Sequence, residues 1–192
     1  MTDTTDDDYD RLVVAAAAGD SVALHRLLAA LRPRIVRYCR ARMGSGSTAT
    51  DDVAQEVLLA LLGALPRYRA TGAGFLAFVY GIAAHKIADH YRYQQRHPVQ
   101  PVAEPHEVAE QRPGPEQRAL SREVAGRLGV LLGELSPQSR EILALRMIAG
   151  LSARETAAAT GSTPTAVRVA QHRALRKLRA RLETEGFTDL AC

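Results

Sequence analysis

Apolar residues recur at every third or fourth position along most of the chain, which is the period of an amphipathic helix. The spacing predicts helices over 20–43, 51–64, 75–96, 116–132 and 136–148, followed by a pair of helices within 151–182. No convincing strand pattern, in which apolar and polar residues alternate, occurs anywhere in the sequence. The pattern therefore predicts an all-α protein.

Prolines and glutamates interrupt the helical pattern over 97–115, and we interpret this stretch as an extended linker. The three helices before it have compatible apolar stripes, which predict a self-sufficient bundle over 20–96. The helices after it predict a second helical domain over 116–185. An acidic segment, 1–19, precedes both domains, and we expect residues 1–10 to be frayed.

Individual residues predict where the first three helices begin and which of their sides are buried. Asp20 and Thr50 stand where side chains that cap a helix N-terminus are expected. The apolar stripe of the third helix, 75–96, turns Val79 toward the core and leaves Tyr80 on a more exposed side. These assignments predict which side of each helix remains available for a partner.

The stretch 151–182 carries the clearest local signals in the chain. Ser152 and Glu155 have the spacing of a reciprocal capping box, which begins a helix. Gly161 can adopt the positive φ that often ends a helix. With a three-residue turn between this helix and the next, the stretch is typical of a helix-turn-helix.

The second helix of this pair is strongly basic. Ser162 or Thr163 can cap it, and Pro164 fits its first position because a missing N–H costs nothing there. Residues 163–182 include six Arg or Lys and no acidic residue. This composition favours an anionic partner, most simply duplex DNA, although any three-helix core could use the same pair for packing.

The order of residues along the basic helix predicts their roles on DNA. Side chains near the N-terminus of such a helix reach base edges, and later cations meet phosphates. The candidate base readers are Thr163, Thr165 and Arg168, followed on the same helix by Gln171, His172, Arg173 and Arg176. The alternative is a solvated cationic face, which we expect for Arg179 and Arg181.

Two other surfaces are candidates for binding. Asp52, Gln55 and Glu56 share one side of the helix 51–64, where they suit a basic protein partner or form an ordinary solvated face. Aromatic and charged residues interleave around the following loop and the next helix, a mixture that suits unstacked bases. This third set is Tyr68, Arg69, His85, Lys86, Asp89, Arg92 and Arg96, with Tyr68 equally interpretable as a residue at the edge of the core.

The residues offer no catalytic set. The chain lacks a phosphate-binding glycine loop, a Cys/His cluster with metal-ligand spacing and a nucleophile elbow. Its six histidines are scattered along the chain. We therefore expect no enzymatic activity, no cofactor and no bound metal.

The net charge of +4 permits a nucleic-acid partner without proving one. The two cysteines, Cys39 and Cys192, suit a reducing compartment, and Cys39 is expected to be buried as a small apolar residue. The longest apolar run, 57–65, is too short to cross a bilayer, and the N-terminus is acidic, unlike a secretory signal. These features predict a soluble cytoplasmic protein with no membrane contact.

Three segments, taken in order, resemble bacterial sigma factors of the extracytoplasmic-function (ECF) group. DDVAQEVLLALLGALPRYR (51–69) resembles the polymerase-binding helix of that family and the loop after it, and FLAFVYGIAAHKIADHYR (75–92) resembles its −10 recognition helix. The segment 135–179, beginning LSPQSREILALRMIAGLSARE, resembles its −35-reading domain. The segments FLAFVYGIAAHK and AVRVAQHRAL are most similar to the sigma-D-like branch of that group.

The resemblance implies a sigma-2-like bundle and a sigma-4-like helix-turn-helix domain that together direct core RNA polymerase to promoters. It implies that Asp52, Gln55 and Glu56 contact the clamp helices of core polymerase. The β′ clamp and the β subunit of polymerase are both implied as partners of the chain. It also implies a pocket at Tyr68, the loop to Gly74 and His85 for a base flipped from the melting −10 duplex, while the −35 element is read as duplex. An anti-sigma factor is a plausible further partner.

Two positions depart from the family pattern. Phe78 stands where the family usually has Trp, and His85 stands where it usually has Asn. The resemblance therefore does not determine which base is preferred at −10. A rival interpretation of the whole chain is a helix-turn-helix repressor or activator that binds an operator unaided. The segment 51–96 argues against that rival, because an operator-binding protein needs no such surface.

Overall fold

The computed structural model describes residues 6–44, 49–70, 72, 74–97 and 129–184, and within these ranges every regular element is helical. The elements are α1 (Asp6–Ala17), α2 (Ser21–Met43), α3 (Thr50–Ala64), the 3₁₀ turn η1 (Leu65–Arg67), α4 (Phe75–Arg96), α6 (Pro137–Leu143), the π-helical turn η2 (Ala144–Ile148), α7 (Ala153–Thr160) and α8 (Pro164–Thr184). Residues 129–133 are also helical. The all-α prediction is confirmed, while the expected linker 97–115 lies outside the described residues beyond His97.

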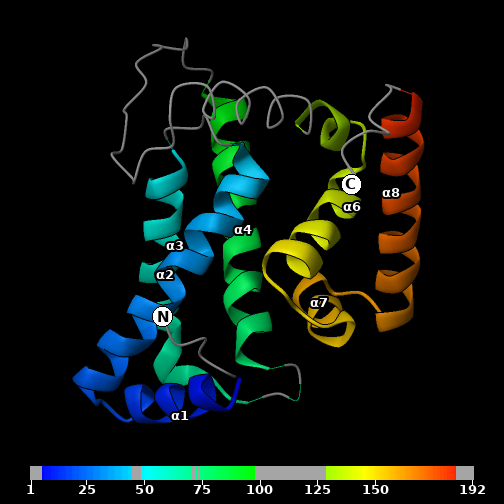
Figure 1. Ribbon diagram of the computed structural model, residues 1–192. Coiled ribbons are helices and arrows are strands. Elements are labelled where there is room, and N and C mark those ends of the chain that lie inside the picture. The colour runs from blue at the N-terminus through cyan, green and yellow to red at the C-terminus, as the bar shows by residue number, and fades with distance from the viewer. Residues whose placement is uncertain (1–5, 45–48, 71, 73, 98–128, 185–192) are drawn as a thin grey trace, which may run out of the picture.

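Helices α2, α3 and α4 form the first bundle (Figure 1). The side chain of Asp20 caps α2 by accepting hydrogen bonds from the backbone N–H groups of Val22 and Ala23, as its position predicts. The apolar stripes of the three helices meet in one core, as their spacing predicts. Its fully buried members include Leu27, Leu31, Ile35, Val57, Leu61, Val79 and Ile87.

The expectation that residues 1–10 are frayed is wrong for residues 6–10, and residues 1–5 lie outside the described part of the chain. Residues from Asp6 onward belong to α1, which packs across one end of α2 (Figure 1). Tyr9 and Val13 are buried, and the Tyr9 hydroxyl accepts a hydrogen bond of 3.2 Å from Nη1 of Arg34. The apolar positions of α1 have helical spacing. The neighbouring aspartates give the segment a polar composition, which is why no helix was expected there.

The expected cap at Thr50 is also wrong. The N-cap of α3 is Ala49, which makes no side-chain capping bond, and Thr50 Oγ1 is buried without a hydrogen-bond partner. Asp51 and Asp52 lie in the first turn instead, where negative charge interacts favourably with the N-terminal end of the helix dipole.

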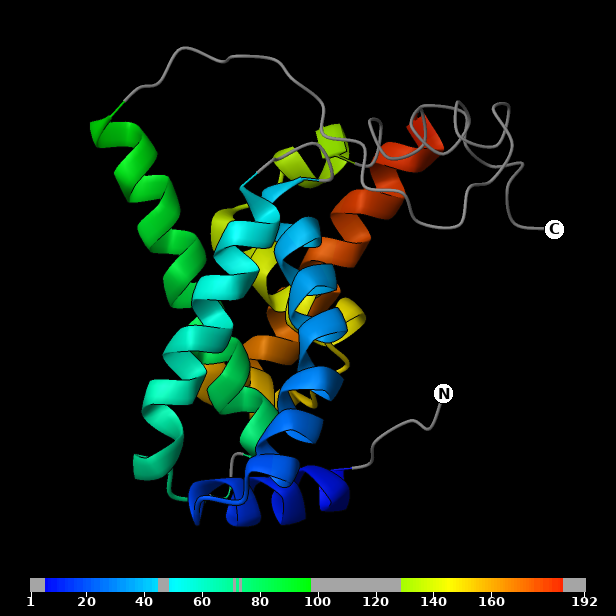
Figure 2. The same cartoon turned by 90° about the vertical axis from the view of Figure 1, so that its left-hand side faces the viewer.

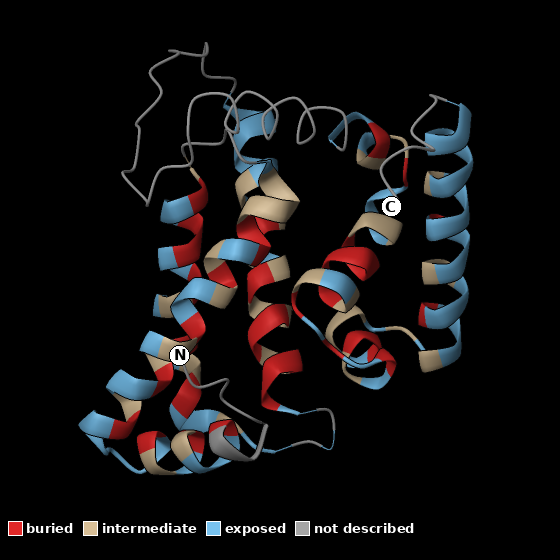
Figure 3. Cartoon of the chain, viewed as in Figure 1, coloured by how far each residue is buried: buried red, intermediate tan, exposed pale blue. Residues whose placement is uncertain are grey.

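Tyr80 is buried, although the apolar stripe of α4 predicts an exposed position. Its ring meets the ring of Tyr38 edge-on, with 5.0 Å between centroids. Burial raises the pKa of Tyr80. The prediction fails because α4 is covered by α2 and α3 on one side and by α7 on another, so more than one stripe of it is buried (Figures 1 and 3).

The helices of the helix-turn-helix begin and end where their local signals predict. The Ser152–Glu155 capping box begins α7, and Gly161, at φ 63°, ends it in the left-handed conformation. Thr163 caps α8, since its Oγ1 accepts a hydrogen bond of 3.2 Å from the backbone N–H of Ala166. Ala157 and Val167 pack with Ile142 at the crossing of the two helices. These contacts confirm the predicted helix-turn-helix.

The two domains pack against each other in a way that the sequence pattern does not predict. Helix α7 lies along α4, and η2 lies along α2 (Figures 1 and 2). Leu145, Ala149 and Leu151 of the second domain belong to the same buried cluster as the core of the first. The described parts of both domains therefore share one continuous core.

Cys39 is fully buried in α2, as predicted, and burial raises the pKa of its thiol to about 12. At pH 8 the thiol is therefore protonated and shielded, and the reactive thiolate is scarce. In a Cys192→Ser protein, we expect no reaction with a disulfide-exchange reagent at pH 8 until denaturant is added. Rapid labelling of the native protein would contradict this burial.

Candidate functional site

The basic face of α8 is open to solvent. Figure 3 shows the side of α8 that faces away from the rest of the molecule as exposed along its length. Val167 and Ala174 turn inward and are buried, which holds the helix in place through its opposite side. The exposed candidates are Thr163, Thr165, Arg168, His172, Arg173 and Arg176. The helix therefore presents these cations and hydroxyls together on its outer side.

Gln171 differs from the other candidates because it is half-buried and already has a partner. Its Oε1 accepts a hydrogen bond of 2.9 Å from Nε of Arg146, which lies in η2. Arg146 also donates from Nη1 to the carbonyl oxygen of Leu151. This arginine ties the start of the helix-turn-helix to the middle of α8, so Gln171 contributes to positioning the helix in this structure.

Arg181 is exposed, as expected, but its charge is paired with a carboxylate of the same domain. Its guanidinium donates to both carboxylate oxygens of Glu134, with 2.8 Å between Nε and Oε2. The hydrogen bond from Arg181 lowers the pKa of Glu134. Lys177 donates to the carbonyl oxygen of the same residue at 2.6 Å. The C-terminal half of α8 is thus anchored to the turn before α6.

The acidic face of α3 is exposed as the sequence predicts. Asp52, Gln55 and Glu56 all lie at the surface, while Val53 and Val57 on the other side of the helix are buried. A hollow of about 320 Å³ lies beside this face, between α2 and α3, and Asp52 and Gln55 line it. The face therefore lies beside a hollow that is lined by both charged and apolar side chains.

Glu56 links this face to α4, because its Oε2 lies 3.4 Å from Nζ of Lys86. Both side chains are substantially exposed, so the pair contributes little to stability. It does bring the second and third predicted surfaces side by side on the first bundle.

The third candidate surface begins at an aromatic cluster. The half-buried ring of Tyr68 lies 5.2 Å from the ring of Phe75 and 5.0 Å from that of Phe78, measured between centroids. Desolvation raises the pKa of Tyr68, so its hydroxyl stays protonated and able to donate. Tyr68 is thus packed at the edge of the core while part of its surface remains available.

The rest of this surface extends along α4. His85 and Asp89 are exposed, and Asp89 pairs with Arg92 at 2.8 Å between Oδ1 and Nη1. Arg69 lies exposed at one end of the surface and Arg96 at the far end of α4. The structure therefore spreads these candidates along one helix rather than gathering them all in a single pocket.

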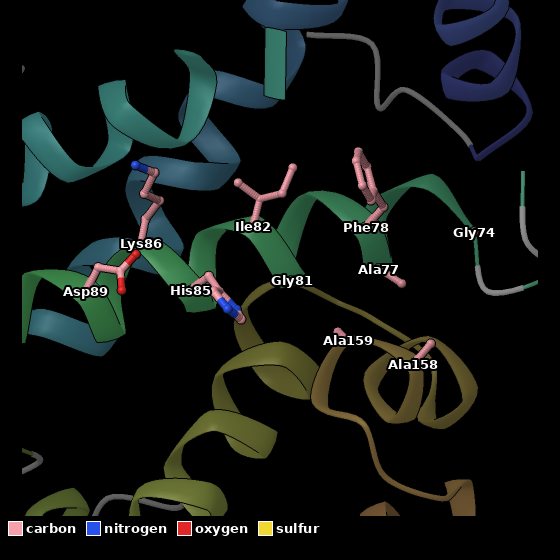
Figure 4. A pocket seen from close by; sticks show the side chains of 10 residues that line it. All are labelled: Gly74, Ala77, Phe78, Gly81, Ile82, His85, Lys86, Asp89, Ala158 and Ala159. Atoms are coloured by element: carbon pink, nitrogen blue, oxygen red, sulfur yellow. The ribbon is translucent and has the colours of Figure 1, made fainter. Parts of the chain in front are cut away.

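A hollow of about 560 Å³ lies between α4 and α7 (Figure 4). From α4 it is lined by Phe78, His85 and Lys86 among others, and from α7 by Ala158 and Ala159. Sequence reasoning missed the two alanines. Their only sequence signal is that they are small residues on the helix-turn-helix, which does not distinguish an interdomain wall from a solvated face.

In the described ranges, no three His, Cys, Asp or Glu side chains are grouped so that they could hold a metal ion. Within those same ranges, no helix has the length and apolar character needed to span a membrane.

Comparison with known proteins assigns both domains. Residues 27–97 match the family Sigma-70 region 2, and residues 125–178 match the family Sigma-70, region 4. The ECF RNA polymerase sigma factor SigD of Mycobacterium tuberculosis is 51% identical over 180 residues, covering 92% of this chain and 85% of SigD. The ECF RNA polymerase sigma factor ShbA of Streptomyces griseus is 47% identical, covering 90% of this chain and 94% of ShbA.

A solved structure is similar along nearly the whole chain. It is that of CnrH in complex with the cytosolic domain of CnrY, with a TM-score of 0.68 and 29% identity, covering 92% of this chain and 99% of CnrH. CnrH of Cupriavidus metallidurans is itself named an RNA polymerase sigma factor.

The chain belongs to the ECF group of sigma-70-family RNA polymerase sigma factors. Within that group it falls in the SigD-like branch. It therefore directs promoter-specific transcription, with core RNA polymerase and promoter DNA as its partners. These findings argue against an operator-binding regulator that acts without polymerase.

Because Arg146 connects η2 to α8, we expect Arg146→Ala to lower the free energy of unfolding by about 1–3 kcal/mol, since Gln171 and the Leu151 carbonyl lose their donor. Chemical denaturation followed by circular dichroism measures this change. Arg179→Ala, at an exposed position of the same helix, is the matched control and should leave stability within about 0.5 kcal/mol. Equal stability of the two variants would contradict the positioning role.

Proposed function

We propose that this sigma factor divides its tasks among the three exposed surfaces described above. The acidic face of α3 binds core polymerase, the surface from Tyr68 along α4 holds melted −10 DNA, and α8 reads the −35 duplex. The observation that carries the proposal is the separation of charge: Asp52, Gln55 and Glu56 are exposed on one helix, and the basic stripe is exposed on another. An acidic surface repels DNA, whereas a basic one attracts it.

At the −35 element, α8 enters the major groove with its N-terminal residues toward the bases. Thr163, Thr165 and Arg168 read base edges, and His172, Arg173 and Arg176 meet phosphates. Gln171 contacts DNA only after its side chain gives up the hydrogen bond that it accepts from Arg146. Support comes from the exposure of these side chains along a single helix whose other side is anchored.

At the −10 element, a base leaves the stacked duplex and enters the region of Tyr68 and His85. Flipping costs a few kcal/mol, which stacking on aromatic rings and hydrogen bonds to the base edge must offset. The Tyr68, Phe75 and Phe78 cluster supplies the aromatic surface. His85 supplies an edge donor or acceptor, while Arg69, Lys86, Arg92 and Arg96 attract the backbone and Asp89 orients Arg92.

At the polymerase, the α3 face meets the β′ clamp helices, and the remaining contacts reach the β subunit. A protein inhibitor of the anti-sigma type is a further partner that we propose for this chain. This proposal is supported by the solved structure of the similar protein CnrH in complex with the cytosolic domain of CnrY. All these encounters would take place in the cytoplasm, where polymerase works.

Run-off transcription with purified core polymerase tests this function. The chain, added to core enzyme and sheared genomic DNA, should produce transcripts with defined 5′ ends that core enzyme alone does not make. Mapping those ends identifies the promoters. The proposal fails if no promoter-dependent transcript appears, and tight binding of the free chain to an operator without any effect of polymerase would favour the rival regulator.

Arg168→Ala should weaken discrimination at one position of the −35 element by about 1–3 kcal/mol, because a base-edge contact is lost. The measurement compares run-off rates on promoters with single −35 substitutions. Arg176→Ala is the matched control, since loss of a phosphate contact should lower rates on all these promoters alike. An unchanged preference in the Arg168→Ala protein would exclude base reading by this residue.

Glu56→Lys should weaken binding to core polymerase, because the acidic face loses one charge and gains the opposite one. Competition against a second sigma factor for limited core enzyme measures the loss, which we expect to be roughly tenfold or more. Since Glu56 also pairs with Lys86, the double exchange Glu56→Lys with Lys86→Glu is the control. The double exchange restores the pair but not the face, so recovery of binding would show that the pair alone mattered.

A further inference from the structure

A further hollow, of about 410 Å³, lies at the end of the first bundle where α4 begins. It is called here the α1 hollow, and the residues that line it include Tyr9 and Asp10 of α1, Tyr68, Gly74 and Phe75. Its volume lies in the range of sites that hold a small molecule or a single base. Because α1 crosses this end of the bundle (Figures 1 and 2), it supplies a wall that the −10 residues predicted from the sequence do not include.

Aromatic rings form part of the wall of the α1 hollow. Tyr9 and Phe75 are buried, with 6.4 Å between their ring centroids, and the ring of Tyr68 meets that of Phe75 edge-on. The hydrogen bond from Arg34 fixes the Tyr9 hydroxyl and with it the position of the Tyr9 ring. Tyr68 is only half-buried, so part of its ring remains available for stacking by a planar base.

Asp10 adds a carboxylate to this aromatic hollow. Its side chain is exposed, and no residue in the described part of the chain donates a hydrogen bond to it or pairs with it as a cation. Helix α1 begins at Asp6, so Asp10 lies beyond the first turn, where interaction with the helix dipole has fallen off. Neither an ion pair nor the helix dipole therefore accounts for an acidic residue at this position.

The carboxylate lies near the hydroxyl group of Tyr68. Desolvation raises the pKa of Tyr68, and the negative charge of Asp10 raises it further. The α1 hollow thus brings together a stacking surface, on Tyr68, and a hydrogen-bond acceptor, on Asp10. These two groups come from parts of the chain separated by the whole of α2 and α3.

The neighbouring hollow between α4 and α7 lacks a carboxylate that is free to accept. Its only acidic lining residue is Asp89, which already pairs with Arg92 at 2.8 Å. Gly74 lines both hollows, so they adjoin, and a strand lying along α4 could place a base in either one. Of the two, the α1 hollow is the better match for a base that is stacked and read by its edge.

The chemistry of a carboxylate restricts which bases it can read. An ionised carboxylate accepts hydrogen bonds and donates none. Adenine, cytosine and guanine each carry an exocyclic amine that can donate to it, and Asp accepting from the cytosine amine is a common contact. Thymine has no amine, and the two carbonyl oxygens beside its single N–H repel a negative charge. Asp10 therefore suits a base that carries an amine and disfavours thymine.

We propose that Asp10 is a specificity-determining residue for the −10 element. The flipped base enters the α1 hollow, stacks on Tyr68 and donates its exocyclic amine to the Asp10 carboxylate, so promoters carry adenine, cytosine or guanine at that position. This inference rests on the proposed use of the Tyr68 surface for melted DNA. It adds an acceptor from α1, a helix that lies outside the segments 51–69 and 75–92 from which the −10 surface was predicted.

The test removes the amine from the DNA and the carboxylate from the protein. Holoenzyme, formed from the chain and core polymerase, is titrated with labelled single strands that carry the non-template −10 segment of a promoter mapped by the run-off experiment. In each strand one base is replaced by its analogue without the amine: purine for adenine, hypoxanthine for guanine or 2-pyrimidinone for cytosine. Each protein is compared with itself, so an overall change in DNA affinity on loss of a negative charge cancels.

With the parent protein, loss of the amine at the flipped position should weaken binding roughly tenfold or more, because a hydrogen bond to a charged acceptor is lost. Asp10→Ala should show no such difference at that position. Glu183→Ala removes an exposed carboxylate at the end of α8 and is the matched control, which should keep the difference. An equal loss in Asp10→Ala and the parent, or the absence of any position at which the amine matters, would overturn the proposal.

Asp10→Asn gives a second measurement with almost no change in shape. The amide can donate to a carbonyl oxygen of thymine, which a carboxylate cannot do. Thymine at the flipped position should therefore weaken binding much less in this variant than in the parent. The same penalty for thymine in both proteins would contradict the role of Asp10 as the acceptor.

Ala70→Trp tests the place of the base without changing Asp10, because Ala70 is exposed and lines the α1 hollow. A large ring there should exclude the base, so an abasic site at the flipped position should cost this variant less affinity than it costs the parent. An equal cost would place the base elsewhere and overturn the inference. If the parent holoenzyme bound these strands without regard to any −10 base, the proposed −10 surface itself would fail.

Dependence on bases without dependence on their amines would overturn the role of Asp10 alone and leave the proposed function standing.

Discussion

Helix α4 is packed on two sides, and much of the structure follows from that constraint. One side of it completes the core of the first bundle through Val79 and Ile87, and another packs against α7. Buried apolar area is stabilising wherever it is found, so a helix with two apolar sides attracts a second layer. The surface that the family resemblance assigns to melted DNA is the one that this second layer occupies.

The packing between the domains includes a buried charge as well as apolar contacts. A carboxylate such as Glu141 is tolerated inside it only while Tyr38 and Arg42 are in place, because its desolvation is costly. Loss of either partner would therefore leave a buried charge uncompensated at the contact between α2 and α6.

Local signals in the sequence predicted most of the elements and the open sides of two of them. Asp20, the Ser152–Glu155 box, Gly161 and Thr163 behave as predicted because capping depends on neighbours two to four residues away. The exposure of Asp52 and Arg168 followed from the period of a helix with one buried side. The cap expected at Thr50 is wrong because α3 begins at Thr50 itself, with Ala49 as its N-cap, and the Thr50 side chain is buried. Helix α1 was not predicted because its aspartates concealed its apolar period.

The sequence alone determined most of the helices, the helix-turn-helix and the charged surfaces, since each depends on contacts within a few turns of chain. Tertiary structure alone decided that Tyr80 is buried, that Gln171 is held by Arg146 and that Glu141 meets α2. These facts depend on pairs of residues separated by 25 to 103 positions. No local pattern encodes such a pairing. The sequence around a Glu or Tyr on the outer side of a helix is the same whether solvent or another domain covers that side.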